Sequence, residues 1–454
     1  MSLALGASRV AAQQVDAASE TVASETVHGS PDEGASDAEP EDPGTRASAE
    51  SDTETAGAVD SDAGHAAGEP AFEPFDWSLV PLPVATSDLG VGGAALANLV
   101  WFDGEHTPFR QRLLVAATLT HELFQTYALV FERVGLGASK VRLRANLVFA
   151  ANPANHYCGV GNDAECNRRL AESAVLDLGL NPGEMGYDRT VDRYFRQRSV
   201  SLSGGLGVRI PLARQGHWLD VSWRGERSWS GFFGEPGPYP LSAYARDQPE
   251  GEEGFASELG FGWFLDRRDA EVRTTSGFVV GAYLRGATRA IGSEWSYLGG
   301  TAFVAGYQPL DARRRWVWAS RLVADVVGGD TTTRELSRFG GLWTGNGFGG
   351  SAYGRGIRAN RFLGGVKVVT QSELRGTLHE LESGLAFGAQ AFVDLGLVGE
   401  SIDAWGGDGL GPRLGFGGGV SIRWARLFQL RVDVAVSPSE SFAPQFYLAL
   451  FDPF

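Results

Sequence analysis

The sequence lacks any long hydrophobic run. Of its 454 residues, 43% are hydrophobic, yet no window approaches the roughly eighteen uninterrupted apolar residues of a membrane-spanning helix. This absence excludes a helical membrane protein. It leaves open a membrane β-barrel, because barrel strands are about ten residues long and alternate apolar with polar side chains.

Residues that carry chemistry are sparse and scattered. The seven histidines show no HxxxH spacing, and no GxSxG segment occurs. The Gly-x-Gly runs lie in strand-like segments, where they are weak candidates for phosphate binding. No basic patch of the kind that binds nucleic acid is present. We therefore predict no enzyme activity, no cofactor and no nucleic-acid partner.

Cysteine is almost absent. The chain has only Cys158 and Cys166, both in a polar stretch. In an oxidising compartment such a pair indicates a disulfide that closes a loop. A metal site would need more ligands than His156, which lies near the pair, so we predict no bound metal.

The negative charge is concentrated at one end of the chain. Residues 1–70 hold 15 acidic residues against two basic ones and so account for −13 of the net charge of −16. This stretch has almost no large apolar side chains, so it cannot bury enough surface to offset chain entropy. We predict a disordered acidic tail over residues 1–75, most simply a solvated linker, with a remnant of a signal peptide at its start.

Glycine and aromatic residues are abundant, and alternation begins near residue 89. The 62 glycines suit strands that curve closely, and the 11% of aromatic residues suits the girdles of a membrane barrel. In residues 140–149 apolar residues alternate with Arg142, Arg144 and Asn146. Arginine inside a dry core is costly without partners, whereas in a water-filled lumen it is solvated. We therefore predict one outer-membrane β-barrel over residues 76–454.

The alternating segments number fifteen. A bacterial barrel normally has an even number of antiparallel strands. We therefore predict sixteen and expect the uncounted one within residues 152–196 or 230–253. From residue 276 onward long loops alternate with short turns, which places the loops that hold Arg355 and Asp403 outside the cell.

Six motifs carry a family resemblance. They are LDRRDAEVRTTSG (265–277), FGGLWTGNGFGGSAYGRGI (339–357), QSELR (371–375), FVDLG (392–396), LRVDVA (430–435) and HYCGVGND (156–163). In order and spacing they resemble the bacterial surface antigen family, the BamA/TamA-type barrels of the outer-membrane protein assembly and translocation superfamily. The resemblance covers residues 76–454. Nothing in residues 1–75 resembles the family's periplasmic transport-associated domains.

The resemblance implies a role for the loop after residue 339. Arg355, between Gly354 and Gly356, would fold back into the lumen and pair with an inward carboxylate. Asp394 is the first candidate partner and Glu373 the second. Alternation along both strands agrees, and an Arg fork matches a carboxylate well. Phe454, on the face of Phe446, fits the terminal signal for insertion of outer-membrane barrels.

The family resemblance also implies a function. We expect a barrel of the bacterial outer membrane that inserts or translocates polypeptides or lipid. Its expected partners are outer-membrane lipid and lipopolysaccharide, the barrel assembly machinery during biogenesis, and a polypeptide substrate. The alternative is a structural or passive-pore barrel, favoured by the unmatched residues 1–75. An outer-membrane enzyme assembled from distant strands is a remote alternative.

Overall fold

The computed structural model describes residues 74–454 apart from short gaps. The gaps are residues 87–89, 107–108, 122, 137–138, 163–164, 233–241, 271–272, 342–344, 382–383, 404–410, 425–427 and 450–451. The predicted acidic tail therefore lies almost wholly outside the described residues.

One antiparallel sheet of sixteen strands forms the molecule, and each strand pairs with its neighbours in chain order. The first eight strands are β1 (Phe75–Thr86), β2 (Gly90–Trp101), β3 (Gln111–Thr120), β4 (Gln125–Val134), β5 (Arg142–His156), β6 (Arg196–Pro211), β7 (His217–Phe232) and β8 (Glu252–Asp266). The other eight are β9 (Gly277–Ala287), β10 (Tyr297–Pro309), β11 (Trp316–Gly329), β14 (Val366–Glu380), β15 (Ala386–Gly399), β16 (Arg413–Trp424), β17 (Phe428–Val436) and β18 (Gln445–Ala449). The prediction of a sixteen-stranded, all-β fold is confirmed.

The remaining elements lie in loops. They are the helices α2 (Arg168–Asp177), α3 (Tyr187–Arg193), α4 (Ala243–Asp247) and α5 (Thr333–Leu336), the 3-10 turns η1 (Arg289–Ile291) and η2 (Pro438–Glu440), and the two-residue strands β12 (Arg338–Phe339) and β13 (Gly345–Asn346). Among the described residues no helix has the length and apolarity to cross a membrane.

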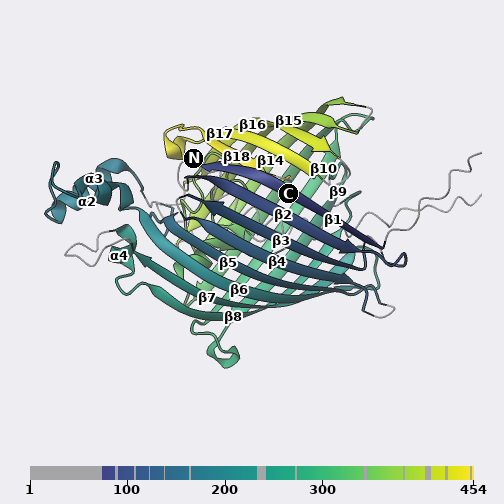
Figure 1. Ribbon diagram of the computed structural model, residues 1–454, viewed down its shortest axis with the longest axis horizontal. Coiled ribbons are helices and arrows are strands. Elements are labelled where there is room, and N and C mark those ends of the chain that lie inside the picture. The colour runs from purple at the N-terminus through teal and green to yellow at the C-terminus, as the bar shows by residue number, and fades with distance from the viewer. Residues whose placement is uncertain are drawn as a thin grey trace, which may run out of the picture.

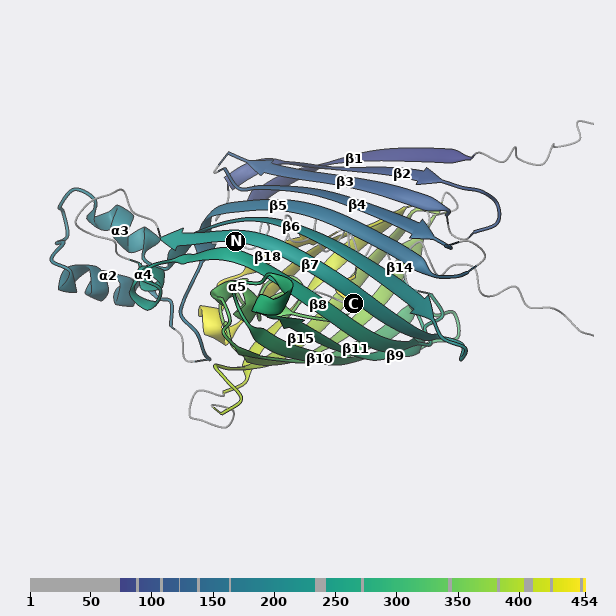
Figure 2. The ribbon, with the colours of Figure 1, turned by 90° about the horizontal axis from the view of Figure 1, so that it is seen from below.

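The alternation read from the sequence becomes two different faces. In β10, Phe303 and Ala305 are buried, while Leu298 and Val304 between and beside them are exposed. The sheet curls so that the first set points inward (Figures 1 and 2). Its outer surface is therefore apolar and exposed, as a surface in contact with lipid must be.

The sixteenth strand lies outside the segments where we expected it. Residues 152–196 and 230–253 contain the helices α2, α3 and α4 instead. The uncounted strand is β1, which precedes the start of the predicted alternation near residue 89 and contains Pro81 and Pro83. Proline removes a main-chain donor, but an edge strand tolerates it where the missing donor faces away from the neighbouring strand.

Loop length separates the two ends of the barrel. The helices α2, α3 and α4 project from one end, while short turns join the strands at the other (Figure 1). Because the strands run up and down in order, β1 starts and β18 ends on the short-turn side. The long loop between β11 and β14, which carries Arg355, starts at the end with the helices.

The last strands overlap the first. Leu430 of β17 alternates with inward Arg431 and shares its face with the exposed Val432 and Val434. It packs against a cluster on the inward face of β2, β3 and β4, which consists of Leu96, Leu114, Ala116, Ala128 and Val130. The outer face of β17 therefore meets the inner face of the first strands, so the sheet laps over itself here.

Candidate functional site

The loop between β11 and β14 folds into the barrel. Its Phe348, Tyr353, Ile357 and Phe362 are all at most 1% exposed, and they belong to the same buried cluster as the inward side chains of β8 to β11. Ile357, at the tip of the loop, is fully buried. The loop is therefore packed like a protein core.

Two glycines shape the tip of this loop. Gly354 has a φ of 138° and Gly356 a φ of 90°, both in the region that residues with a Cβ avoid. A Cβ at Gly356 would also lie 2.5 Å from the carbonyl oxygen of Val436. The main chain can therefore turn sharply on both sides of Arg355 and press against β17.

Arg355 binds both carboxylates that the sequence offered. Its main-chain N and Nε donate to Oδ2 of Asp394 at 2.8 and 2.9 Å, and Nη2 donates to Oδ1 at 2.8 Å. Its Nη1 donates to Oε2 of Glu373 at 2.5 Å. The guanidinium also lies 3.5 Å from the ring centroid of Phe392. Burial lowers the pKa of Arg355, but the two carboxylates outweigh it and raise this pKa above its usual value.

Glu373 is shared among three arginines. Besides Arg355, it accepts from Arg375 Nε at 2.8 Å and from Arg431 at 2.7 and 3.1 Å. These residues come from β14 and β17, so the carboxylate links the loop tip to two parts of the wall. A buried carboxylate needs such partners, since an unpaired one would carry a large desolvation cost.

A second network holds the first half of the loop. Glu335 of α5 accepts from Arg285 of β9 at 2.9 Å and from Arg224 of β7 at 3.3 Å. Asp325 of β11 binds Arg285 at 2.8 Å and Lys367 of β14 at 3.2 Å. The loop is thus fastened by ion pairs at both its beginning and its tip.

Phe454 does not lie on the lipid-facing side with Phe446. It is 6% exposed and belongs to the buried cluster inside the barrel, whereas Phe446 is 43% exposed. The alternation fails because the strand pairing of β18 ends at Ala449. Whether Phe454 serves as an insertion signal stays a prediction.

The two cysteines form a disulfide in the loop after β5. Beside it, Tyr157 packs edge-on against Tyr244 at 5.1 Å between ring centroids, and its hydroxyl donates to Asp247 at 3.0 Å. The contacts of Tyr157 join the loops after β5 and β7, whereas the disulfide links two residues within the first of these loops. The helices α2, α3 and α4 share one buried cluster and thus form one assembly at the end of the barrel that carries the long loops.

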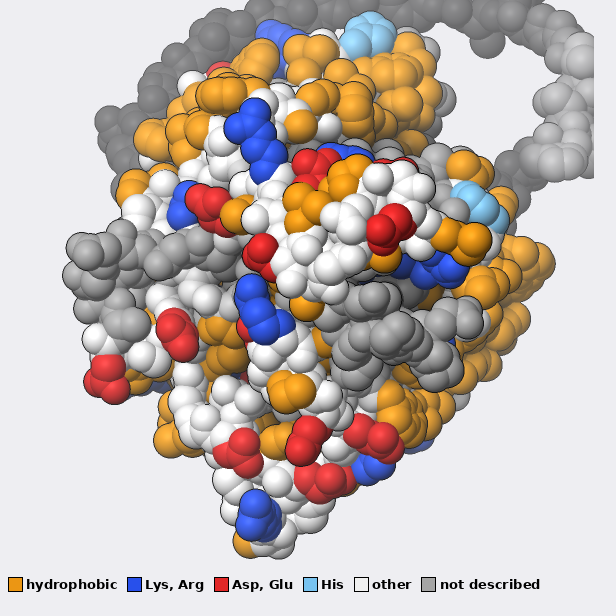
Figure 3. Space-filling view, turned by 90° about the vertical axis from the view of Figure 1, so that its left-hand side faces the viewer, with side chains coloured by type: hydrophobic (Ala, Val, Ile, Leu, Met, Phe, Trp, Pro, Cys, Tyr) orange, Lys and Arg blue, Asp and Glu red, His pale blue; other side chains and the backbone are white. Residues whose placement is uncertain are grey.

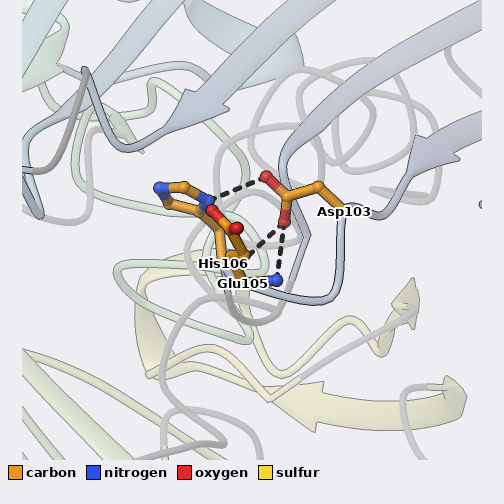
Figure 4. A group of neighbouring side chains, drawn as sticks. All are labelled: Asp103, Glu105 and His106. Atoms are coloured by element: carbon orange, nitrogen blue, oxygen red, sulfur yellow. Dashed lines mark hydrogen bonds and ion pairs between the residues drawn. The ribbon is translucent and has the colours of Figure 1, made fainter.

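One group of side chains resembles a metal site in composition. Asp103, Glu105 and His106 lie together in the loop after β2 (Figure 4). Both nitrogens of His106 have partners, Asp103 at 2.8 Å and Arg110 at 2.9 Å. Main-chain hydrogen bonds from His106 lower the pKa of Asp103 to about 2. Because Arg110 already supplies a positive charge, we assign no metal to this loop.

The free edge of β1 is poor in hydrogen-bond donors. Phe102 N donates to Pro74 O, and the register of β1 with β2 is continuous. The main-chain N–H and C=O groups of the even-numbered β1 residues therefore point toward β2. The main-chain groups of the odd-numbered residues point to the free edge. Two of these residues are Pro81 and Pro83, which have no N–H. The N–H of Trp77 is bonded to Asp76. Among the described residues no pairing joins β1 to β18.

Comparison with known proteins identifies the class. The Omp85 superfamily domain matches residues 125–443, more than two thirds of the chain. The chain belongs to the Omp85 superfamily and is an outer-membrane β-barrel. Among curated proteins none matches the sequence.

Three solved barrels resemble the chain. CdiB from Escherichia coli has a TM-score of 0.54 at 11% identity and covers 84% of this chain and 62% of its own. BamA from Haemophilus ducreyi, in a form lacking POTRA domains 1–3, has a TM-score of 0.49 at 13% identity, with 80% and 66% covered. CdiB from Acinetobacter baumannii has 0.45 at 12%, with 83% and 59% covered. The chain spans less than two thirds of these structures' lengths, and at such identities the likeness to CdiB from E. coli shows the fold alone.

The partners of the predicted carboxylates were not predicted. The alternation pointed to Asp394 and Glu373 but not to Arg375, Arg431 or the second network around Glu335. The available signal was the set of charged residues on the inward faces of neighbouring strands. The alternation of a strand predicts which side of the sheet each side chain faces. It does not predict the register between strands, which decides which side chains lie at the same level in the barrel.

Proposed function

We propose that this barrel inserts or translocates polypeptide at the outer membrane, and that the seam between β1 and β18 is where the polypeptide contacts the wall. Membership of the Omp85 superfamily supports the general activity. The observation that carries the proposal is the free edge of β1, which exposes main-chain groups but lacks the donors for a continuous ladder.

The short last strand supports the same interpretation. Over the described residues, β18 pairs along five positions and β1 along twelve, so the described part of β18 can pair with only part of the β1 edge. Leu430 of β17 packs against the inward face of β2, β3 and β4, so the two ends of the sheet overlap instead of meeting edge to edge. A seam of this kind offers a strand from another chain a place to pair.

Lipid is the second partner that we propose. Trp77 and Leu79 of β1 and Leu119 of β3 are apolar side chains that point outward and are at least half exposed. Charged side chains are scattered among apolar and neutral ones over the end with the helices (Figure 3). Contacts with lipopolysaccharide and with the assembly machinery remain predictions.

The proposal is tested with the full chain in liposomes. The probe is a urea-denatured eight-stranded outer-membrane barrel, and the readout is the rate at which it becomes protease-resistant and heat-modifiable. We expect the protein to accelerate this folding. The double variant Pro81→Val/Pro83→Val restores two N–H donors, each worth about 0.5–1.5 kcal/mol when paired. It should let β1 pair more fully with β18 along the part of the seam that they share, and so remove most of the acceleration.

Pro211→Val at the end of β6 is the matched control, because this residue lies far from the seam. It should fold the probe like the unaltered protein. If the unaltered protein gives no acceleration over empty liposomes, polypeptide insertion is ruled out for this probe. If the double variant remains fully active, the seam is not the place of contact.

A further inference from the structure

Three arginines converge on the segment that follows β18. Arg321 comes from β11, Arg375 from β14 and Arg431 from β17, and all three point into the barrel. The segment, residues 452–454, has the sequence Asp-Pro-Phe. Its Asp452 and Phe454 lie among the inward arginines rather than on the lipid-facing surface.

The carboxylate of Asp452 has a complete set of donors. Its Oδ1 accepts from Arg431 Nη1 at 2.6 Å and from Gln429 Nε2 at 2.8 Å. Its Oδ2 accepts from Arg375 Nη1 at 3.2 Å. Charge-assisted hydrogen bonds of this kind are the strong ones, and these come from two different strands.

The ring of Phe454 lies between cations. Arg321 is 4.7 Å and Arg375 5.0 Å from its centroid, and the Tyr307 ring lies 6.4 Å away. Arg321 and Arg375 also donate to the main-chain oxygens of Pro453 and Phe454, each at 3.0 Å. The arginines thus bind an acidic side chain, an aromatic ring and the main chain between them.

The same arginines contact the inward loop. Arg321 lies 4.6 Å from the ring centroid of Tyr353 and donates to Ala352 O at 2.7 Å. It is therefore placed between a loop ring and the ring of Phe454. Arg375 and Arg431 share Glu373 with Arg355. The segment and the loop tip are held by one continuous set of side chains.

We propose that Arg321, Arg375 and Arg431 form a binding site for an acidic–aromatic peptide segment, and that residues 452–454 occupy it as an internal ligand. Occupation holds the Arg355 loop in the barrel. Loss of the internal ligand empties the site for a peptide of the same chemistry and loosens the loop. The inference goes beyond polypeptide insertion and does not depend on it.

The test uses the purified full chain in detergent. The variant Asp452→Asn/Phe454→Ala weakens the internal ligand. The probe is a fluorescent peptide of residues 445–454 with an amidated end, and its affinity is measured by anisotropy. Because a tethered ligand acts at high effective concentration, the variant should bind the peptide about tenfold or more tightly than the unaltered protein does. A peptide with the same two substitutions should not bind.

Loop release gives a second readout. Trypsin should cut after Arg355, Arg358 or Arg361 several times faster in the variant, and the peptide should restore protection. Adding Arg321→Gln to the variant should abolish peptide binding. The double variant Asp403→Asn/Phe446→Ala is the matched control, because both side chains are exposed and remote from the arginines. It should behave like the unaltered protein.

Gel mobility without heating and circular dichroism establish that each variant is folded. The single variant Asp452→Asn, which changes one atom, serves if the double variant does not fold. Equal peptide affinity in a folded variant and in the unaltered protein would overturn the binding site. Peptide binding without any change in loop cleavage would overturn the link to the loop.

Discussion

At the scale of single residues, Arg355 makes contacts with three residues at once and not with a single carboxylate. Its main chain and side chain bind Asp394, its guanidinium also binds Glu373, and Phe392 covers it. Removing one member of a buried ion pair typically costs about 3–5 kcal/mol, because the partner is left charged and unpaired. The loop tip therefore depends on this residue.

We expect Arg355→Ala to destabilise the barrel by about 3–5 kcal/mol, because two buried carboxylates lose a partner. The measurement is the temperature at which the heat-modifiable band disappears from gels, together with trypsin cleavage of the loop. Arg358→Ala is the matched control, since Arg358 lies in the same loop, is 28% exposed and pairs with Glu440. An unchanged transition and cleavage pattern in Arg355→Ala would contradict this role.

The residues of the site could be predicted only where a sequence motif and the inward face of a strand both indicated them. Arg355 lies between two glycines, and the alternation of β14 and β15 places Glu373 and Asp394 on their inward faces. These three residues could therefore be predicted from the sequence. The sharing of Glu373 with Arg431 was not, because it depends on the relative register of β14 and β17. These strands are separated in the sheet by β15 and β16.

At the scale of elements, the glycine-rich β16 makes room for the loop. A Cβ added to Gly415 would lie 1.8 Å from the carbonyl oxygen of Arg355. This distance is far below any van der Waals contact, so only glycine fits. The position of the loop tip therefore requires a glycine in β16, although 60 positions separate Arg355 from Gly415.

We expect Gly415→Ala to push the loop tip away from the wall and to raise trypsin cleavage after Arg355. Loop release should also lower the temperature of the gel transition. Gly306→Ala in β10 is the control, because nothing lies within 4 Å of the Cβ it would add. Equal cleavage in the two variants would show that the contact does not restrain the loop.

Strands with clean alternation were predictable as elements, whereas β1 was not. Its Pro81 and Pro83 are incompatible with a central strand, and only the edge position makes them acceptable. Edge position is a property of the assembled sheet, so the sequence of β1 alone does not contain it. The same applies to Phe454, whose inward turn depends on where β18 stops pairing.

At the scale of the whole molecule, the packed loop obstructs the interior. Phe348, Tyr353 and Ile357 are buried there, and ion pairs hold the loop at its beginning and at its tip. We expect the unaltered protein in planar bilayers to show little steady ion current. Arg355→Ala should show longer and larger openings. A large steady current through the unaltered protein would instead favour the passive-pore alternative.

The contact of Leu430 with the inner face of β2, β3 and β4 has a consequence for the size of the barrel. The diameter of a closed barrel is set by its number of strands and their stagger. A sheet whose ends lap over one another, joined there by apolar contact, is free of that constraint. We therefore expect the circumference to lengthen when the ends slide, so that the bore widens while every strand-to-strand ladder stays intact.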